Sequence, residues 1–192
     1  MVFLLRMHMP PPRPLTRGEI DMAALVFGAA IDYARVRIHC RSYLWFGLQD
    51  RHTVMAPNGA IYCMPPQYRA DFSCQDARTR LLFMHEMVHV WQHQRGYRLR
   101  WHGLCLALGG AYASGRAYRY DARLSEPDRA FSDFNMEQQA EIVTHYFGAR
   151  HLGLRAHVDS LGALERVLTP FLRDARDPAL LPKPWFARRL TT

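Results

Sequence analysis

Several stretches in which apolar residues recur at helical spacing predict helices along the chain. Thr16 and Glu19 have the spacing of a capping box, which marks the start of the first helix. Ser73 and Asp76 repeat this spacing before the second helix, and Gly96 ends it because glycine readily adopts the left-handed backbone of a helix end. The predicted helices cover about 16–34, 73–96, 101–114, 134–147 and 158–171.

Short runs rich in β-branched and aromatic residues lie between the first two predicted helices. Val36–His39 and Tyr43–Phe46 have this character and predict strands. The stretch 53–64 predicts a hairpin, because Asn58 and Gly59 favour a tight turn with positive φ. The combination predicts an α+β fold in which a small β-sheet with a hairpin packs on a central helix.

The chain of 192 residues is long enough for one domain with its own core. The prolines in 10–14 predict an extended linker. Near the C-terminus, more prolines predict an irregular tail with Trp185 and Phe186 as anchors. The predicted organisation is an N-terminal extension at 1–15, a folded domain at 16–175 and a C-terminal tail at 176–192.

The stretch LLFMHEMVHVWQHQRGY at 81–97 contains the motif H-E-x-x-H as His85, Glu86 and His89. Residues four apart lie on one face of a helix, about 6 Å apart along its axis, so both histidines can bind one zinc ion. Glu86 projects beside that ion, where it can take a proton from a bound water. The helix is otherwise apolar nearly all round, which predicts a buried central element in which the polar side chains need partners.

A catalytic zinc site has three protein ligands and an open position for water. The pattern H-E-x-x-H-x-x-G-x-x-H is excluded, because Gln92 and Arg95 stand where it has glycine and histidine. His93 lies about 12 Å from His85 along the helix axis and about 80° round it, too far to share a tetrahedral ion. We expect His93 to be a solvated or hydrogen-bonded histidine near the helix end.

A second group of ionisable residues lies in FNMEQQAEIVTHYF at 134–147. Glu137, Glu141 and His145 are four residues apart and share one face of the predicted helix. By spacing alone, the two glutamates are either part of a functional stripe or acids on a solvated helix face.

H-E-x-x-H followed by a helix with N-x-E-x-x-x-E resembles the gluzincin branch of the zinc metallopeptidases. The resemblance implies that Glu137 is the third zinc ligand and that Glu141 orients His85 or His89 from behind. That branch has asparagine next to the ligand and aspartate as the distal acid, whereas here Met136 intervenes and the distal acid is glutamate. The alternative in which the two glutamates exchange roles therefore stays open.

A wider resemblance covers roughly 15–154. The series LTRGEI, VFGAAIDYARVRIH, APNGAIY, HEMVHVWQ and NMEQQAEIV is similar to the metallopeptidase toxin domains carried by VgrG spike proteins of type VI secretion systems, or encoded beside them. It implies a zincin-like fold, delivery by a spike or another carrier to the periplasm of a competing cell, and a cognate immunity protein. By family analogy, an edge strand beside the active helix would offer unpaired backbone groups to an extended peptide. This strand is 60–64 or a neighbour, and the alternative that it is a plain strand of the core sheet stays open.

The net charge is +8, and Lys183 is the single lysine among the basic residues. The sequence has no run of basic residues, no basic stripe with interleaved aromatic residues and no nucleic-acid motif. We therefore expect a dispersed basic surface and no nucleic-acid partner. The four cysteines lack C-x-x-C spacing, and we expect free, mostly buried thiols.

The N-terminus, MVFLLRMHMPPPRPLT, lacks the features of a signal peptide. The longest apolar run, 103–113, is too short to span a bilayer. We expect a protein made in the cytoplasm with no integral membrane segment, which another machine must carry if it acts elsewhere.

The expected reaction is hydrolysis of a peptide bond in a protein or peptide substrate. Zinc held by His85, His89 and Glu137 would lower the pKa of a bound water toward about 7. Glu86 would accept the proton and deliver it to the leaving amine. One further donor would stabilise the oxyanion, with a slight preference for His145. The candidates for this donor are Tyr112, Tyr118, Tyr120, His145 and Tyr146.

Two alternatives belong to other functional classes. A catalytically silent zinc scaffold or interaction module would retain zinc without hydrolysis, and the intact Glu86 argues against it. A basic nucleic-acid or membrane-surface binder would bind polyanions in a salt-dependent way without stoichiometric zinc, and the lack of a basic run argues against it.

Overall fold

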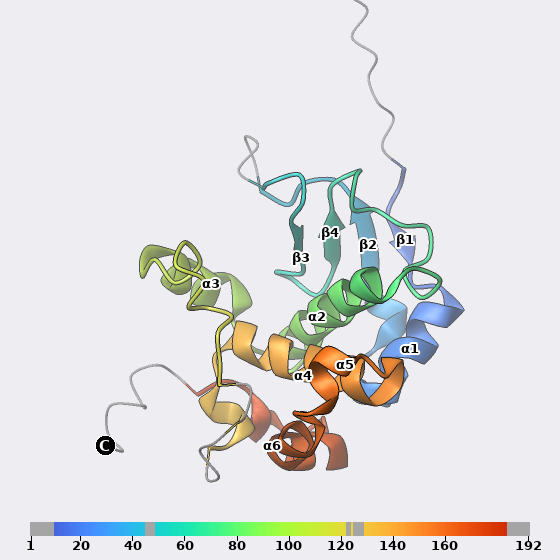
Figure 1. The fold of residues 1–192 in the computed structure, drawn as a ribbon. Coiled ribbons are helices and arrows are strands. Elements are labelled where there is room, and N and C mark those ends of the chain that lie inside the picture. The colour runs from blue at the N-terminus through green and yellow to red at the C-terminus, as the bar shows by residue number, and fades with distance from the viewer. Residues whose placement is uncertain (1–9, 45–48, 122–123, 125–128, 184–192) are drawn as a thin grey trace, which may run out of the picture.

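A long helix, α2 (Ala77–Gln94), lies between a small sheet and the helices of the C-terminal half (Figure 1). The computed structural model describes residues 10–44, 49–121, 124 and 129–183. The described chain is an α+β fold with a four-stranded mixed sheet and six α-helices, which confirms the predicted fold class.

The strands of the sheet lie in the order β1-β2-β4-β3. β2 and β4 are parallel, and β1 and β3 pair antiparallel on the two outer sides. β4 includes most of the stretch 60–64 and is paired on both sides, so β3 is the edge strand next to it. The strands are β1 (Arg13–Pro14), β2 (Arg37–Cys40), β3 (Val54–Met55) and β4 (Ile61–Cys63).

The predicted hairpin forms between β3 and β4, and Gly59 in its turn has a φ of +81°. A Cβ atom at Gly59 would lie 2.6 Å from Cδ2 of His93, so a larger residue would be strained by the positive φ and would displace the His93 ring. His93 is exposed, lies against this turn near the end of α2, and is not part of the group of His85, His89 and Glu137.

α1 (Arg17–Phe27) begins as predicted and ends earlier. The Thr16 side chain accepts a hydrogen bond from the backbone N–H of Glu19, and the Glu19 side chain accepts one from the backbone N–H of Thr16. Gly28 adopts a φ of +51° and ends the helix, so the predicted extension to residue 34 is wrong. The residues after Gly28 keep the apolar spacing of a helix because their side chains are still buried in the core, although their backbone forms a turn.

α2 begins after Asp76, whose side chain accepts a hydrogen bond from the backbone N–H of Thr79. Ser73 takes no part in this cap, and its hydroxyl donates to Asp71 instead. Gly96, with a φ of +91°, follows the end of the helix as predicted.

The remaining helices differ from the predictions at their ends. The helix predicted at 101–114 stops before Gly109 and Gly110, where Gly110 has a φ of +65°. The helix predicted at 158–171 forms, but it begins at Leu161, and a separate short helix ends at Val158. The observed helices are α3 (Leu99–Leu108), α4 (Met136–Leu152), α5 (Arg155–Val158) and α6 (Leu161–Arg173), with short 3-10 helices η1 (Tyr33–Arg35), η2 (Phe131–Asp133) and η3 (Pro178–Leu180).

The core surrounds α2, which packs against α4, and α4 in turn packs against α6. α2 and the inner face of the sheet bury side chains in the same cluster, which explains why α2 is apolar nearly all round. The cysteines are free, with Cys40 and Cys63 buried. Among the fully buried side chains of the core are Ile38, Ile61, Met84, Met87, Trp91, Phe147 and Phe171.

The contacts of the domain extend beyond the expected limits at 16 and 175. Arg13 belongs to β1, and its guanidinium donates to both carboxylate oxygens of Glu19 at 2.8 and 2.7 Å. At the other end, the indole of Trp91 donates to the carbonyl of Ala175 at 2.6 Å, and Leu180 is buried. Both end segments therefore pack on the same core.

Some expectations fall on residues outside the described ranges. Tyr43 and Leu44 lie in a bend and form no strand, and the rest of the predicted strand to Phe46 is not described. Trp185, Phe186 and residues 1–9 also lie outside the described residues. No helix in the described part of the chain is long and apolar enough to cross a bilayer.

The buried carboxylate of Glu19 gives a test of the fold. It is fully buried and accepts hydrogen bonds from Arg13, the backbone N–H of Thr16 and the backbone N–H of Phe72. We expect Glu19→Ala to lower the free energy of unfolding by about 3–5 kcal/mol, because it leaves buried donors unpaired. Asp21→Ala, which breaks the exposed pair with Arg17 on the same helix, should change it by less than about 0.5 kcal/mol. Urea unfolding measures both, and equal effects would contradict the role of Glu19.

Candidate metal centre

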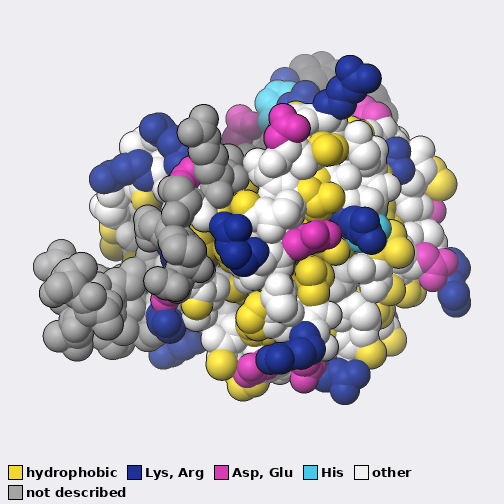
Figure 2. All heavy atoms as spheres, turned by 60° about the horizontal axis from the view of Figure 1, so that its bottom comes forward, with side chains coloured by type: hydrophobic (Ala, Val, Ile, Leu, Met, Phe, Trp, Pro, Cys, Tyr) yellow, Lys and Arg dark blue, Asp and Glu magenta, His cyan; other side chains and the backbone are white. Residues whose placement is uncertain are grey.

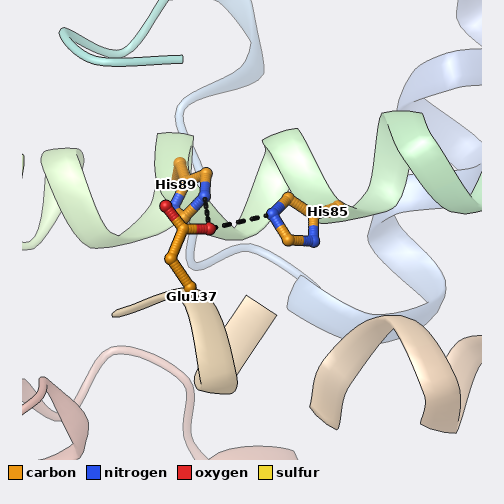
Figure 3. Close-up of side chains that lie close together, drawn as sticks. All are labelled: His85, His89 and Glu137. Atoms are coloured by element: carbon orange, nitrogen blue, oxygen red, sulfur yellow. Dashed lines mark hydrogen bonds and ion pairs between the residues drawn. The ribbon is translucent and has the colours of Figure 1, made fainter. Parts of the chain in front are cut away.

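α2 and α4 bring three metal-ligating side chains together (Figure 3). His85 and His89 project from consecutive turns of α2, and Glu137 projects from the first turn of α4. The Nε2 atoms of both histidines lie 3.2 Å from Oε2 of Glu137. The three ligand atoms lie within 4.8 Å of one another, so the group could hold a metal ion.

The start of α4 decides where Glu137 lies. The side-chain oxygen of Asn135 accepts hydrogen bonds from the backbone N–H groups of Glu137 and Gln138, both at 2.9 Å. The Gln138 side chain accepts one from the backbone N–H of Asn135 in return. Glu137 therefore occupies the first turn, where the helix dipole stabilises a carboxylate.

The charges of this group depend on one another. Burial opposes ionisation of Glu137, but His89 and His85 hold its pKa well below the ordinary value. Burial also opposes protonation of His85, but hydrogen bonds to Glu137 and Glu141 raise its pKa to about 10. Histidine protons therefore hold the metal-free cluster together, and a divalent cation would replace these protons.

Glu86 lies in the same buried region. Its side chain is 4% exposed, and Oε2 has no hydrogen-bond partner in the described part of the chain. Burial raises the pKa of Glu86 to about 7, although His89 and His85 oppose this shift. A bound cation with its water would satisfy this oxygen, so the residues present fit a metal ion.

Glu141 lies one turn beyond Glu137 and contacts the other side of the His85 ring. One carboxylate oxygen is 3.2 Å from Nδ1 of His85, and the other is 3.3 Å from Nε2 of His145. Burial opposes ionisation of Glu141, but hydrogen bonds from His145 and His85 lower its pKa to about 2. Glu137 thus faces both Nε2 atoms, and Glu141 holds His85 from behind.

Of the two further catalytic candidates, only His145 comes near this group. Nδ1 of His145 is 2.6 Å from the hydroxyl of Tyr120, and its ring stacks on His157 with a centroid distance of 4.2 Å. His145 is therefore linked to the cluster through Glu141. Tyr146 packs edge-on against His151 instead.

The turns after α3 place two tyrosines at the cluster. The hydroxyl of Tyr112 donates to Oε1 of Glu137 at 2.8 Å, and the ring centroid of Tyr118 lies 6.3 Å from that of His85. Burial raises the pKa of both hydroxyls far above the ordinary value, so both remain donors at neutral pH. Among the oxyanion candidates, Tyr112 contacts a candidate ligand directly.

Sequence reasoning missed Gln92. Its side-chain oxygen lies 2.9 Å from Nδ1 of His89, and the residue is fully buried. One signal was available, because an amide three residues after His89 interrupts the apolar surface of a central helix. Its partner on α4, Gln139, gives no comparable signal in a stretch rich in polar residues.

The fold and the site define a small α+β domain in which two packed helices present a His-His-Glu group that could hold a metal ion. A search of solved structures finds the effector domain of Pseudomonas aeruginosa VgrG2b, with a TM-score of 0.60 and 34% sequence identity over 85% of this chain and 87% of that domain. The chain belongs to the family of this effector domain.

A curated relative gives the same relationship in sequence. The type VI secretion system spike protein VgrG2b of Pseudomonas aeruginosa is 43% identical over 142 residues. The match covers 70% of this chain and 13% of the length of the spike protein. No protein-family model matches the chain.

The pKa of Glu86 gives a test of the site in metal-free protein. An acid with a pKa near 7 in the folded state and about 4.5 in the unfolded state lowers stability as pH rises between these values. We expect wild type to lose on the order of 3 kcal/mol of unfolding free energy relative to Glu86→Gln between pH 4.5 and 7. Urea unfolding at several pH values, after removal of metal with a chelator, measures the difference. Parallel pH profiles would show that Glu86 is not buried as described.

Proposed function

We propose that this domain is a zinc-dependent endopeptidase. The observation that carries the proposal is the convergence of His85, His89 and Glu137 beside the buried carboxylate of Glu86. Two imidazole nitrogens and one carboxylate oxygen match a catalytic zinc site, which has three protein ligands and an open position. When bound, zinc would act as a Lewis acid and make a water molecule acidic enough to react near neutral pH.

Glu86 is the proposed general base. A buried carboxylate with a pKa held near 7 can take a proton from the attacking water and pass it to the leaving amine. The hydroxyl of Tyr112, which lies on Glu137, is the proposed additional donor to the oxyanion. Glu141 positions His85, and the contact of His145 with Glu141 makes His145 a support of this carboxylate.

The proposed substrate is an extended segment of a protein. β3 pairs only with β4 in the described part of the sheet, and it contacts α2. An extended peptide can add to such an edge through backbone hydrogen bonds, which places a peptide bond next to the helix that carries the histidines.

We also propose that the domain is an antibacterial toxin delivered by a type VI secretion system. The family relationship to the VgrG2b effector domain supports this proposal. The carrier would be a VgrG-type spike or another secretion component, the site of action the periplasm of a competing cell, and the producing cell would need an immunity protein.

The proposal of a basic nucleic-acid binder has less support. On the face shown in Figure 2, lysine and arginine side chains are scattered among acidic, apolar and other side chains and form no continuous basic patch. Polyanion binding of this kind requires clustered basic charge. Measuring hydrolysis distinguishes the endopeptidase from the catalytically silent zinc scaffold, which would bind zinc and cleave no substrate.

Zinc content and hydrolysis test the proposed activity together. We expect about one zinc per chain in wild type, loss of zinc in His85→Ala and Glu137→Ala, and a 10- to 100-fold weaker affinity in Glu141→Ala. Glu86→Gln should keep zinc and lose about 10²- to 10⁴-fold in the rate of hydrolysis of an unfolded protein. His93→Ala, on the exposed face of the same helix, is the matched control and should change neither quantity.

The outcomes separate the alternatives. Zinc retention without hydrolysis in wild type would support the silent scaffold. A wild-type protein without zinc after chelator-free purification would contradict both zinc proposals.

Expression in a Gram-negative indicator strain tests the proposed compartment. We expect the domain to stop growth when an added signal sequence exports it to the periplasm and to be tolerated in the cytoplasm. Exported Glu86→Gln should be harmless at equal protein levels, because it lacks the general base. Growth curves measure the effect, and equal toxicity of wild type and Glu86→Gln would show that toxicity does not depend on hydrolysis.

A further inference from the structure

Two buried glutamines connect the candidate metal centre to the core. Gln92 on α2 and Gln139 on α4 both have no exposed surface, and their side chains contact each other. Burying an amide costs free energy unless all its polar atoms find partners. Each polar atom of these two side chains has at least one partner, so the direction of every hydrogen bond can be worked out.

Backbone carbonyls set the orientation of Gln139. One end of its amide lies 2.9 Å from the carbonyl oxygen of Phe131 and 2.8 Å from that of Leu180. A carbonyl oxygen only accepts, so this end must be the NH2 group, Nε2. The oxygen of the Gln139 amide therefore faces Gln92.

The orientation of Gln92 follows from that of Gln139. The end of its amide that lies 3.0 Å from Oε1 of Gln139 also lies 3.1 Å from the carbonyl oxygen of Met136. Both neighbours are acceptors, so this end must also be the NH2 group. The oxygen of Gln92 is then the atom 2.9 Å from Nδ1 of His89, and Nδ1 must carry a hydrogen.

We infer that Gln92 and Gln139 are positioning residues that hold His89 in the tautomer with hydrogen on Nδ1. With hydrogen fixed on Nδ1, Nε2 is the nitrogen left to bind a cation. It lies 3.2 Å from Glu137, to which it donates a hydrogen bond when no cation is bound. The role of Nε2 as a metal ligand rests on the proposed function, whereas the hydrogen on Nδ1 follows from the hydrogen bonds.

The two histidines are thereby held in chemically different ways. Glu141, which is 27% exposed, holds Nδ1 of His85 with a carboxylate, whereas a fully buried neutral amide holds Nδ1 of His89. A second carboxylate behind His89 would be buried close to Glu86 and Glu137, where like charges repel. The amide chain orients His89 without adding charge to this region.

The first test reads the tautomer of His89 in the wild-type protein. Long-range ¹H–¹⁵N correlation spectra of the imidazole, recorded on metal-free protein, show which of its two nitrogens carry hydrogen. We expect hydrogen on Nδ1, whether or not Nε2 also donates to Glu137. A ring with hydrogen on Nε2 alone, or a mixture that includes this form, would overturn the inference, and this result is independent of whether the protein binds zinc.

The second test is a double-mutant cycle on zinc affinity. Gln92→Met keeps the size of the side chain and removes the acceptor, so we expect a mixture of tautomers and a 10- to 100-fold weaker zinc affinity. Gln139→Met should have a smaller effect, because the carbonyl of Met136 still orients Gln92. If Gln139 acts through Gln92, the double variant should bind zinc about as well as Gln92→Met.

Gln94→Met is the matched control, because Gln94 lies on α2 and its amide contacts Asp32 instead of His89. It should leave both the tautomer and the zinc affinity unchanged. Additive effects of Gln92→Met and Gln139→Met, or loss of folding stability without a change of tautomer, would assign the glutamines a purely structural role. Absence of zinc in the wild type would instead contradict the proposed function and leave the tautomer measurement as the test.

Discussion

The packing of α4 on α2 places ionisable side chains from both helices in one buried region, and the other features of the site depend on this contact. Isolated burial of His89 or Glu137 would be unfavourable, and the two helices make it tolerable by pairing histidine nitrogens with the Glu137 carboxylate. The register of the helices is critical, because a shift of α4 by one turn, about 5.4 Å, would exchange Glu137 for Glu141. The Asn135 cap and the bond from Gln92 to the Met136 carbonyl oppose such a shift.

Two sets of hydrogen-bonded side chains support the two histidines, and they differ in charge and exposure. On one side, Glu141, His145 and Tyr120 form a partly exposed chain of charged and polar groups behind His85. On the other side, Gln92 and Gln139 link His89 to backbone carbonyls in η2 and η3. The C-terminal segment therefore contributes to the order of the site, because the Leu180 carbonyl helps to orient Gln139.

The segment between α3 and η2 brings a different kind of residue to the cluster. Tyr112, Tyr118 and Tyr120 contact Glu137, His85 and His145 respectively, so one segment touches the site at several points. Gly110 and Gly115 have positive φ in the turns that make this path possible.

The family relationship concerns this domain, which matches 13% of the length of the VgrG2b spike protein.

The sequence by itself determined the features that depend on local backbone geometry. The spacing of His85 and His89, the Thr16 capping box and the turn at Gly59 follow from helix periodicity and from preferred dihedral angles, which act over a few residues. Spacing alone did not distinguish Glu137 from Glu141, and it gave Tyr112 no advantage over the other tyrosines. Only the tertiary structure showed that Glu137 faces both Nε2 atoms, that Tyr112 contacts Glu137 and that Gln92 contacts His89, because contacts between helices depend on how their surfaces pack and where each helix begins. It also decided the early end of α1 and the parallel pairing of β2 with β4, since burial of apolar residues does not specify the path of the backbone.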